Sequence, residues 1–340
     1  LTSWLLANWE WVMLGFYTLE KIVKLSPTKQ DDIFPQGYGE ADFDLDKSPL
    51  YYYDSNGELQ VSSKHSLFRT DTGEELGVHG KNYTKDLRQL SYKTMIDNQR
   101  EVIRSSGLNT TDITEEISIG GVGQKCFVRH VLPHEELKTP GGDHASISFL
   151  GVSSLNGIWP MSLSVGANQW ACQNNQIFTS GASMLYKSKH NLQLDIDKGY
   201  KLIANSVDIF SQEVDLWHNW ASIGVTDEDA FILFAKAANC KYVTDYLREN
   251  SYLRVSSMLL ENKVYNNTAL MYMWNRWADH YRSKLGFNYW AAYNTLTDWS
   301  SHGPQSKRGR QTKGNNIVTL NHARSERVQE VVIRNFAKAA

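Results

Sequence analysis

Cysteine is scarce in this chain of 340 residues: Cys126, Cys172 and Cys240 are its only cysteines, and they lie far apart. An odd number without CxxC spacing excludes a disulfide framework and a zinc ribbon. Unpaired thiols are typical of a reducing compartment, so we expect a cytoplasmic protein. The composition, 41% hydrophobic and 21% charged, excludes both a disordered chain and a membrane bundle.

Common catalytic motifs are also missing, since the chain contains no P-loop, GxGxxG, HExxH or GxSxG. Asp298 and His302 lie four residues apart on a predicted helix, but a metal ion would need further ligands that the sequence does not indicate. We interpret this pair as packing the end of the helix. We therefore predict no catalytic residue, no metal and no cofactor, and we keep a metal-dependent nuclease using Asp298 and His302 as a third hypothesis.

No apolar run is long enough to span a bilayer. The run at 4–19 has about 16 residues and contains Glu10, whereas a spanning helix needs ~20 apolar residues. We expect a buried or interface helix there, with a membrane-surface helix as the alternative, and we predict no membrane partner.

The net charge of −2 is small but unevenly distributed. Residues 1–60 contain ten acidic and four basic residues, whereas residues 301–340 contain eight basic and two acidic residues. Such a basic end indicates either a nucleic-acid-binding segment or a tail that pairs with the acidic N-terminal part of the same or a neighbouring subunit.

The pattern of apolar residues predicts an α+β protein. Residues 26–60 are expected to be loop with short strands, followed by a tight turn at Asp71–Leu76 and a helix at 84–106 capped by Thr84. From Ile117 the period is two, with turns at 120–123 and 155–157, which predicts three or four antiparallel strands and then a helix from near Asn174. The C-terminal half is predicted to be mostly helical, with helices at about 198–222, 227–250, 253–262, 268–285, 288–301 and 324–339.

Aromatic residues are abundant, and most of the eleven Trp, seventeen Tyr and twelve Phe are expected in the core. Trp274 and Trp277, three residues apart, are interpreted as an ordinary core stripe. Aromatic rings beside cations are, however, what single-stranded nucleic acid requires, because bases stack and phosphates pair with cations. We consider the cluster Lys187–His190 a candidate for contact with an anionic partner.

Four segments, RTDTGEELGVHGKNYT, VGANQWACQNN, YKSKHN and NYWAAYNTLTDWSSHG, occur in an order and spacing that resembles the phage/plasmid-like proteins of domain-of-unknown-function family 932. The resemblance covers roughly residues 60–325 and implies a phage, plasmid or prokaryotic origin, in the host cytoplasm if viral. It divides the chain into 1–60, a core at 61–325 and a basic helix at 326–340. The family's usual Arg before its Val-Cys step is missing, because Gln169-Trp170-Ala171 stands there, which puts a phosphate contact at that place in doubt.

The preferred hypothesis is a nucleic-acid-binding protein of phage or plasmid DNA metabolism and recombination that binds or anneals single-stranded DNA. The expected β-β-β-α order in the middle of the chain is similar to the core of annealing proteins such as Red beta, RecT and Erf, and implies a homo-oligomer. The alternative is a structural or protein–protein interaction module, for phage assembly or host takeover, without catalysis. The residues predicted to contact nucleic acid are Lys125, Arg129, Trp159, Trp170, Lys187, Lys189, His190, Lys307, Arg308, Arg310 and Lys313.

Overall fold

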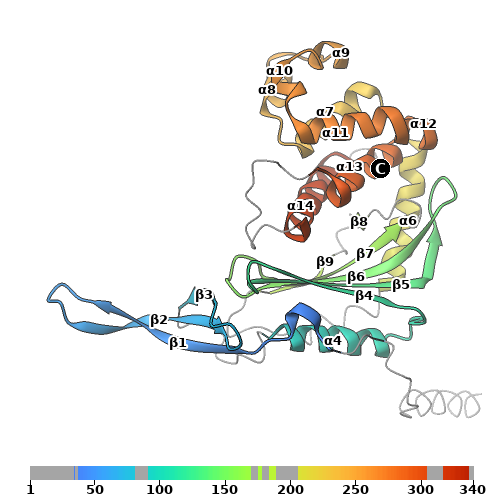
Figure 1. Ribbon diagram of the computed structural model, residues 1–340. Coiled ribbons are helices and arrows are strands. Elements are labelled where there is room, and N and C mark those ends of the chain that lie inside the picture. The colour runs from blue at the N-terminus through green and yellow to red at the C-terminus, as the bar shows by residue number, and fades with distance from the viewer. Residues whose placement is uncertain are drawn as a thin grey trace, which may run out of the picture. The chain divides into compact units, whose positions relative to one another are not determined.

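The structure is a computed structural model that describes Phe34 and residues 37–80, 91–169, 175–177, 184–188, 206–304 and 317–336. The chain divides into two compact units, Leu1–Gln36 and Gly37–Ala340. The following description concerns the second unit, whose elements are labelled in Figure 1.

The second unit begins with a short 3-10 turn, η1 (Gly39–Ala41), and a three-stranded antiparallel sheet in the order β1-β2-β3. The predicted turn at Asp71–Leu76 is confirmed as the connection of β2 to β3. Within the segment predicted as loop with short strands, the described residues contain a strand of nine residues, β1, which lacks an apolar period because most of its side chains are exposed to solvent. The three strands are β1 (Leu45–Tyr53), β2 (Leu59–Arg69) and β3 (Glu75–His79).

A six-stranded antiparallel sheet follows, and it confirms the α+β class. Its strands run in the order β4-β5-β6-β7-β8, and β9 also pairs with β7. The prediction of a helix from near Asn174 was wrong, because residues 175–177 extend the sheet by pairing with β7. The six strands are β4 (Thr114–Gly120), β5 (Lys125–Lys138), β6 (His144–Ser154), β7 (Met161–Gln169), β8 (Asn175–Ile177) and β9 (Met184–Ser188).

Helix α4 (Tyr92–Ser105) covers one face of this sheet (Figure 1). It begins after Ser91, and Thr84, predicted as its cap, lies outside the described residues. Gly151 on β6 permits the close approach of the helix, because a Cβ atom there would collide with the Gln99 side chain. The backbone of β6 therefore contacts the Gln99 side chain of the helix directly at this point.

A buried polar network joins α4 to the sheet. Glu115 on β4 accepts hydrogen bonds from the Arg100 guanidinium at 2.6 and 2.7 Å and lies 2.7 Å from Nε2 of His130, and only 2% of its side chain is exposed. Gln99 Nε2 lies 2.9 Å from Nδ1 of His130. Burial alone would raise the pKa of Glu115, but the hydrogen bonds of Arg100 and His130 outweigh it and lower that pKa to about 2. Burial lowers the pKa of His130, and Glu115 only partly offsets this.

Helices dominate the rest of the described chain, as the sequence predicted. Two predicted helices are divided in the structure: 227–250 is interrupted after Ala237, and 268–285 contains one turn of π-helix, η3. The elements are α6 (Ser206–Ser222), α7 (Asp227–Ala237), α8 (Lys241–Glu249), α9 (Val255–Met258), α10 (Asn262–Tyr265), α11 (Thr268–Arg276), η3 (Trp277–Tyr281), α12 (Arg282–Leu285), α13 (Tyr289–His302) and α14 (Ile317–Phe336).

Helix α13 lies at the centre of the helical part, and its residues 290–300 are all buried. Trp217 of α6 stacks on Trp290 at 5.2 Å between ring centroids, and Trp220 contacts Phe336 of α14 at 5.1 Å. Polar side chains on α13 are tolerated because they bond to the helix itself, as when Thr295 Oγ1 donates to the carbonyl of Ala291. The expectation that aromatics fill the core is confirmed here.

The Glu115 network predicts a loss of stability in acid. Both pKa values are lower in the folded protein, so the unfolded chain binds protons more readily, and the free energy of unfolding falls as the pH falls. The free energy of unfolding begins to fall below pH 6.5, the ordinary pKa of His, because of His130. Glu115 adds a further fall between pH 4.5, the ordinary pKa of Glu, and about pH 2. Denaturant titration between pH 8 and pH 3 measures this dependence.

Glu115→Gln is expected to lower the free energy of unfolding at pH 7 by about 3–5 kcal/mol, because it leaves a buried guanidinium without its counter-charge. Glu116→Gln is the matched control, since the neighbouring Glu116 side chain is 62% exposed and such ion pairs contribute under about 1 kcal/mol. Equal losses for the two variants would contradict this account of the network.

Candidate functional site

The second face of the sheet, opposite α4, combines partly exposed polar side chains with the buried residues Phe127 and Val152, and Phe127 there contacts His322 of α14. Along β7 the residues alternate between buried positions, such as Leu163 and Val165, and partly exposed ones. In the register, Arg129 is opposite Leu150, and Leu150 is opposite Ser164, so these three side chains share a face. His130, which contacts α4, points to the other side. We call this surface the polar sheet face, and its partly exposed polar residues are Lys125, Arg129, Ser162, Ser164 and Asn168.

One end of the polar sheet face carries an aromatic cluster beside a cation. Nζ of Lys125 lies 4.4 Å from the centroid of the Trp159 ring. Trp159 makes edge contacts with Phe127 at 5.3 Å and with His322 of α14 at 5.0 Å. Two hydrogen bonds fix the turn that carries Trp159, because its N–H donates to Ser154 Oγ at 2.8 Å and Ser154 Oγ donates to its carbonyl at 3.0 Å.

The ammonium group of Lys125 contacts the Trp159 ring and is not paired with a carboxylate among the described residues. Burial lowers the pKa of Lys125, and no ion pair recorded for the described part of the chain involves it. A cation over an aromatic face keeps its positive charge and can bind an anion at the same time. Lys125 is therefore available to a negatively charged ligand.

Arg129 differs, because it is already paired across the sheet. Its guanidinium donates to Glu116 Oε2 at 2.7 and 3.1 Å, and Glu116 is the residue opposite it in the register of β4 and β5. The pair lies at the surface, where ion pairs are weak. An incoming anion would thus have to displace Glu116 from Arg129.

The other predicted contact residues are placed less completely. Lys187 lies on β9, opposite Ser162 of β7, which puts it beside the polar sheet face in the register. The remaining seven lie outside the described residues: Trp170, Lys189, His190, Lys307, Arg308, Arg310 and Lys313. The structure therefore brings Lys125, Arg129 and Trp159 to one surface and provides no position for those seven.

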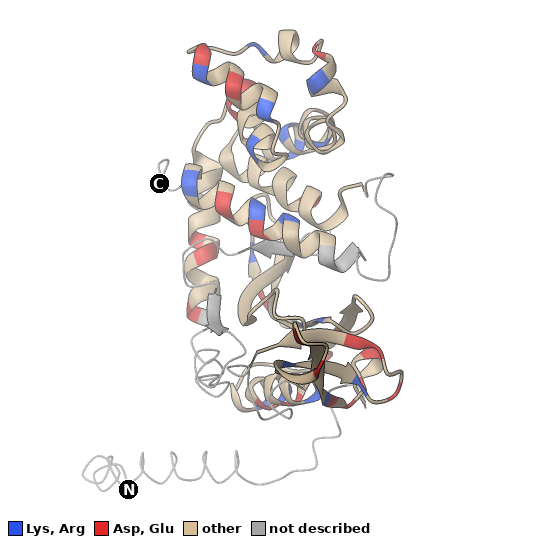
Figure 2. Cartoon of the chain, turned by 90° about the vertical axis from the view of Figure 1, so that its left-hand side faces the viewer, with Lys and Arg blue, Asp and Glu red and all other residues tan. Residues whose placement is uncertain are grey.

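The sequence interpretation missed the serines of the polar sheet face. Ser162, Ser164 and Asn168 alternate with Leu163, Val165 and Ala167, and this alternation was used only to predict a strand. It also signals that one face of the strand is hydroxyl-rich, a useful property because serine hydroxyls bind phosphate oxygens. Both signs of charge occur among the helices of the C-terminal half (Figure 2).

Asp298, the other candidate from the sequence, is a structural residue. Its side chain is 2% exposed and pairs with Arg276, and it accepts hydrogen bonds from Tyr272 at 3.0 Å and Tyr281 at 3.1 Å. Burial and the adjacent carboxylate raise the pKa of Tyr272 to about 12. Both carboxylate oxygens are therefore occupied, and Asp298 joins α11 and η3 to α13.

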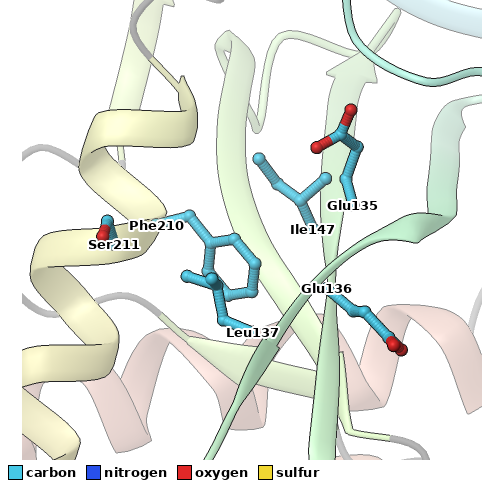
Figure 3. A pocket seen from close by; sticks show the side chains of 6 residues that line it. All are labelled: Glu135, Glu136, Leu137, Ile147, Phe210 and Ser211. Carbon is cyan, nitrogen blue, oxygen red and sulfur yellow. The ribbon is translucent and has the colours of Figure 1, made fainter.

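No metal site is evident in what the structure describes, and the pocket between β5, β6 and α6 is small. No group of three or more His, Cys, Asp or Glu side chains within the described ranges is placed to hold a metal ion. A pocket of about 70 Å³ lies between β5, β6 and α6, where Phe210 points toward Leu137 and Ile147 (Figure 3). It is too small for a ligand of ordinary size, which occupies ~300–1,000 Å³. Among the described helices, none is both long and apolar enough to cross a membrane.

Comparison with protein-family models gives a match over most of the chain. The model of a family described as a domain of unknown function, DUF932, matches residues 75–334. No curated protein matches the chain, and no solved structure does.

Asp298→Asn is expected to lower the free energy of unfolding by about 1–3 kcal/mol, because the hydrogen bonds to a charged carboxylate are lost, whereas Arg276, whose side chain is 39% exposed, can still be hydrated. Thermal unfolding with and without Mg²⁺ measures this, and we expect Mg²⁺ to leave the Tm of the wild type unchanged. Asp279→Asn is the matched control, since Asp279 is an exposed carboxylate on the neighbouring η3. A Mg²⁺-dependent rise in Tm that disappears in Asp298→Asn would instead support a metal site.

Proposed function

Because the chain belongs to the DUF932 family, whose description names no chemistry, we propose its function from its own surface: it binds single-stranded nucleic acid on the polar sheet face. The observation that carries this proposal is the common orientation of Lys125, Arg129 and the β7 serines, all partly exposed, on the sheet face opposite α4. A role in phage or plasmid DNA metabolism, in the cytoplasm, is part of the same proposal.

Three kinds of contact follow from this geometry. Lys125 and Arg129 would pair with phosphates, and the hydroxyls of Ser162 and Ser164 would bond to phosphate oxygens between them. The half-buried ring of Trp159 would stack against a base, a contact worth about 1–3 kcal/mol. Because stacking is available to every base, binding of this kind has little sequence preference.

The near-neutral net charge of −2 favours a local binding surface over general electrostatic attraction. The cation Arg129 is also restrained by Glu116, so the binding is expected to be moderate. Moderate affinity suits a protein that must release its bound strand, as an annealing protein does.

Binding of a fluorescent single-stranded oligonucleotide, measured between 50 and 300 mM salt, tests the proposal. We expect the affinity to fall as salt rises, with a log–log slope of about −0.7 for each phosphate contact. Absent or salt-independent binding would contradict it.

Lys125→Gln with Arg129→Gln is expected to weaken binding about tenfold or more and to reduce the salt slope by about 1.4, the loss of two phosphate contacts. Arg248→Gln is the matched control, because Arg248 is also an arginine paired with a carboxylate, Asp245 at 2.9 Å, but lies on α8. An equal effect of Arg248→Gln would show that only net charge matters.

Glu116→Gln is expected to act in the opposite direction and strengthen binding, because it frees Arg129 from its 2.7 Å partner. Asp245→Asn, which frees Arg248 in the same way, should leave the affinity unchanged. Weaker binding by Glu116→Gln would place the strand elsewhere on the molecule.

A second function, as a protein–protein interaction module without catalysis, is favoured by a different observation. Tyr51, Tyr53, Leu59 and Val61 on the β1–β2 hairpin are all more than half exposed. A chain that forms defined oligomers and ignores DNA under all salt conditions would select this function.

A further inference from the structure

The turn that carries Trp159, residues 155–158, is closed by hydrogen bonds. Ser154, which is fully buried, bonds to both the N–H and the carbonyl of Trp159. Within the turn, the N–H of Ile158 donates to Asn156 Oδ1 at 3.1 Å. The backbone of Trp159 is thus tied to the residue that precedes the turn, so the position of its ring depends on the position of the turn.

Strand β3 supplies a histidine that contacts this turn. Nε2 of His79 lies 2.7 Å from the carbonyl oxygen of Leu155. Because a carbonyl oxygen only accepts, Nε2 carries a proton and donates it. The ring is 6% exposed, and its burial lowers the pKa of His79. His65 of β2, opposite His79 in the register, lies 6.2 Å away between ring centroids. The His79 ring therefore joins the three-stranded sheet to the turn.

Gly77, two residues before His79, lets the backbone of β3 approach the turn. A Cβ atom at this position would lie 2.9 Å from Cα of Asn156 and 3.2 Å from the carbonyl oxygen of Leu155. Carbon atoms pack at about 3.5–4.0 Å, so any other residue would push β3 and the turn apart. A Cβ atom on Gly80, by contrast, would meet no described atom within 4 Å. The requirement for glycine therefore belongs to position 77.

The N–H of Leu155 is held from a different element. It donates to the carbonyl of Gln124 at 2.7 Å, and Gln124 lies in the turn between β4 and β5. Asn156 Nδ2 also donates to Gln124 Oε1 at 3.4 Å. The central sheet thus binds the N–H of Leu155, and β3 binds its carbonyl. Two attachments on different elements fix the direction of the turn, whereas one attachment would allow it to rotate.

From these contacts we infer that β3 controls base stacking at the polar sheet face. His79 and Gly77 hold the turn in the position that presents the Trp159 ring to a base, next to the phosphate contact of Lys125. His79 is a positioning residue, because it acts through Leu155. The inference rests on the proposed function, since the stacking residue is the one assigned there. A ring that is fixed before binding loses less conformational entropy when a base stacks on it, so the fixed turn strengthens binding.

His79→Ala is expected to weaken the binding of a fluorescent single-stranded oligonucleotide about two- to tenfold, the cost of ordering one side chain on binding. The salt slope should stay the same, because no phosphate contact is lost. His79→Gln should restore most of the affinity, since its amide N–H can donate to Leu155 in place of Nε2. Val78→Ser is the matched control, because Val78 is 45% exposed on the same strand, and it should bind like the wild type.

Gly77→Ala is expected to weaken binding as much as His79→Ala does, because the added Cβ atom separates β3 from the turn. Gly80→Ala is its matched control and should bind like the wild type. Circular dichroism shows whether each variant remains folded.

A double-mutant cycle shows whether His79 acts through the Trp159 ring. Trp159→Ala removes the stacking contact, so His79→Ala should cause no further loss of affinity in that background. An equal loss in both backgrounds would reveal a general effect on stability and would overturn the inference.

Fluorine NMR tests the positioning without nucleic acid. In protein labelled with fluorotryptophan, the resonance missing from Trp159→Phe identifies Trp159. It should shift or broaden in His79→Ala and Gly77→Ala, but not in His79→Gln or Val78→Ser. An unchanged resonance in His79→Ala, or undiminished binding by that variant, would overturn the inference. A wild type that binds no single-stranded DNA would overturn the proposed function and the stacking role with it, whereas the fluorine spectra would still show whether β3 positions the turn.

Discussion

The two-residue period of the central sheet is the constraint on which the rest of the structure depends. Glu115 and Glu116 are neighbours on β4, and they are opposite His130 and Arg129 on β5. Because successive side chains point to opposite faces, the same four positions form two pairs, the hydrogen-bonded Glu115 and His130 on one face and the ion pair of Glu116 and Arg129 on the other. The Glu115 pair is sealed beneath α4, whereas the Glu116 pair remains at the surface. A slip of one residue in this register would exchange the two faces and bury Arg129 in place of His130.

These two pairs have different consequences because they lie in different surroundings. In the interface between α4 and the sheet, a buried charge is stable only beside its partner. For Glu115, burial is outweighed by the hydrogen bonds of its partners, which lower its pKa, whereas burial itself lowers the pKa of His130. On the polar sheet face, solvent competes with the ion pair, so the cations are restrained but remain accessible. The side chains beneath α4 are therefore fixed by their partners, whereas those on the polar sheet face can exchange a partner for a ligand. A ligand-binding surface requires this combination. The buried Asp298 cluster has the same rigidifying role in the helical part.

The sequence predicted much of the architecture, because the features involved are local. Alternating apolar residues in β4–β7, the glycine turns and the helix stops each depend on a few neighbouring residues, and the α+β class followed from them. The prediction of a helix from near Asn174 failed, and strands without a buried face were located only loosely. β1 and the distal part of β2 expose most side chains, so no apolar period marks them, and residues 175–177 are too few to show one. The candidate site was predicted only in part, since Lys125, Arg129 and Trp159 share a surface whereas the role of the serines was not recognised.

By itself the sequence determined which residues alternate, where the chain turns and that no common catalytic motif is present. Only the tertiary structure decided which face of each strand is buried, because that depends on what packs against it, and α4 comes from a separate segment of the chain. It also identified the partner of Asp298, which is Arg276, 22 residues away; the sequence favoured a packing role for Asp298 but could not name this partner. Long-range partners of this kind fix the charge state and accessibility of a side chain. Sequence spacing alone therefore left a metal-binding role open for Asp298, whereas its contacts in the folded chain make it a structural residue.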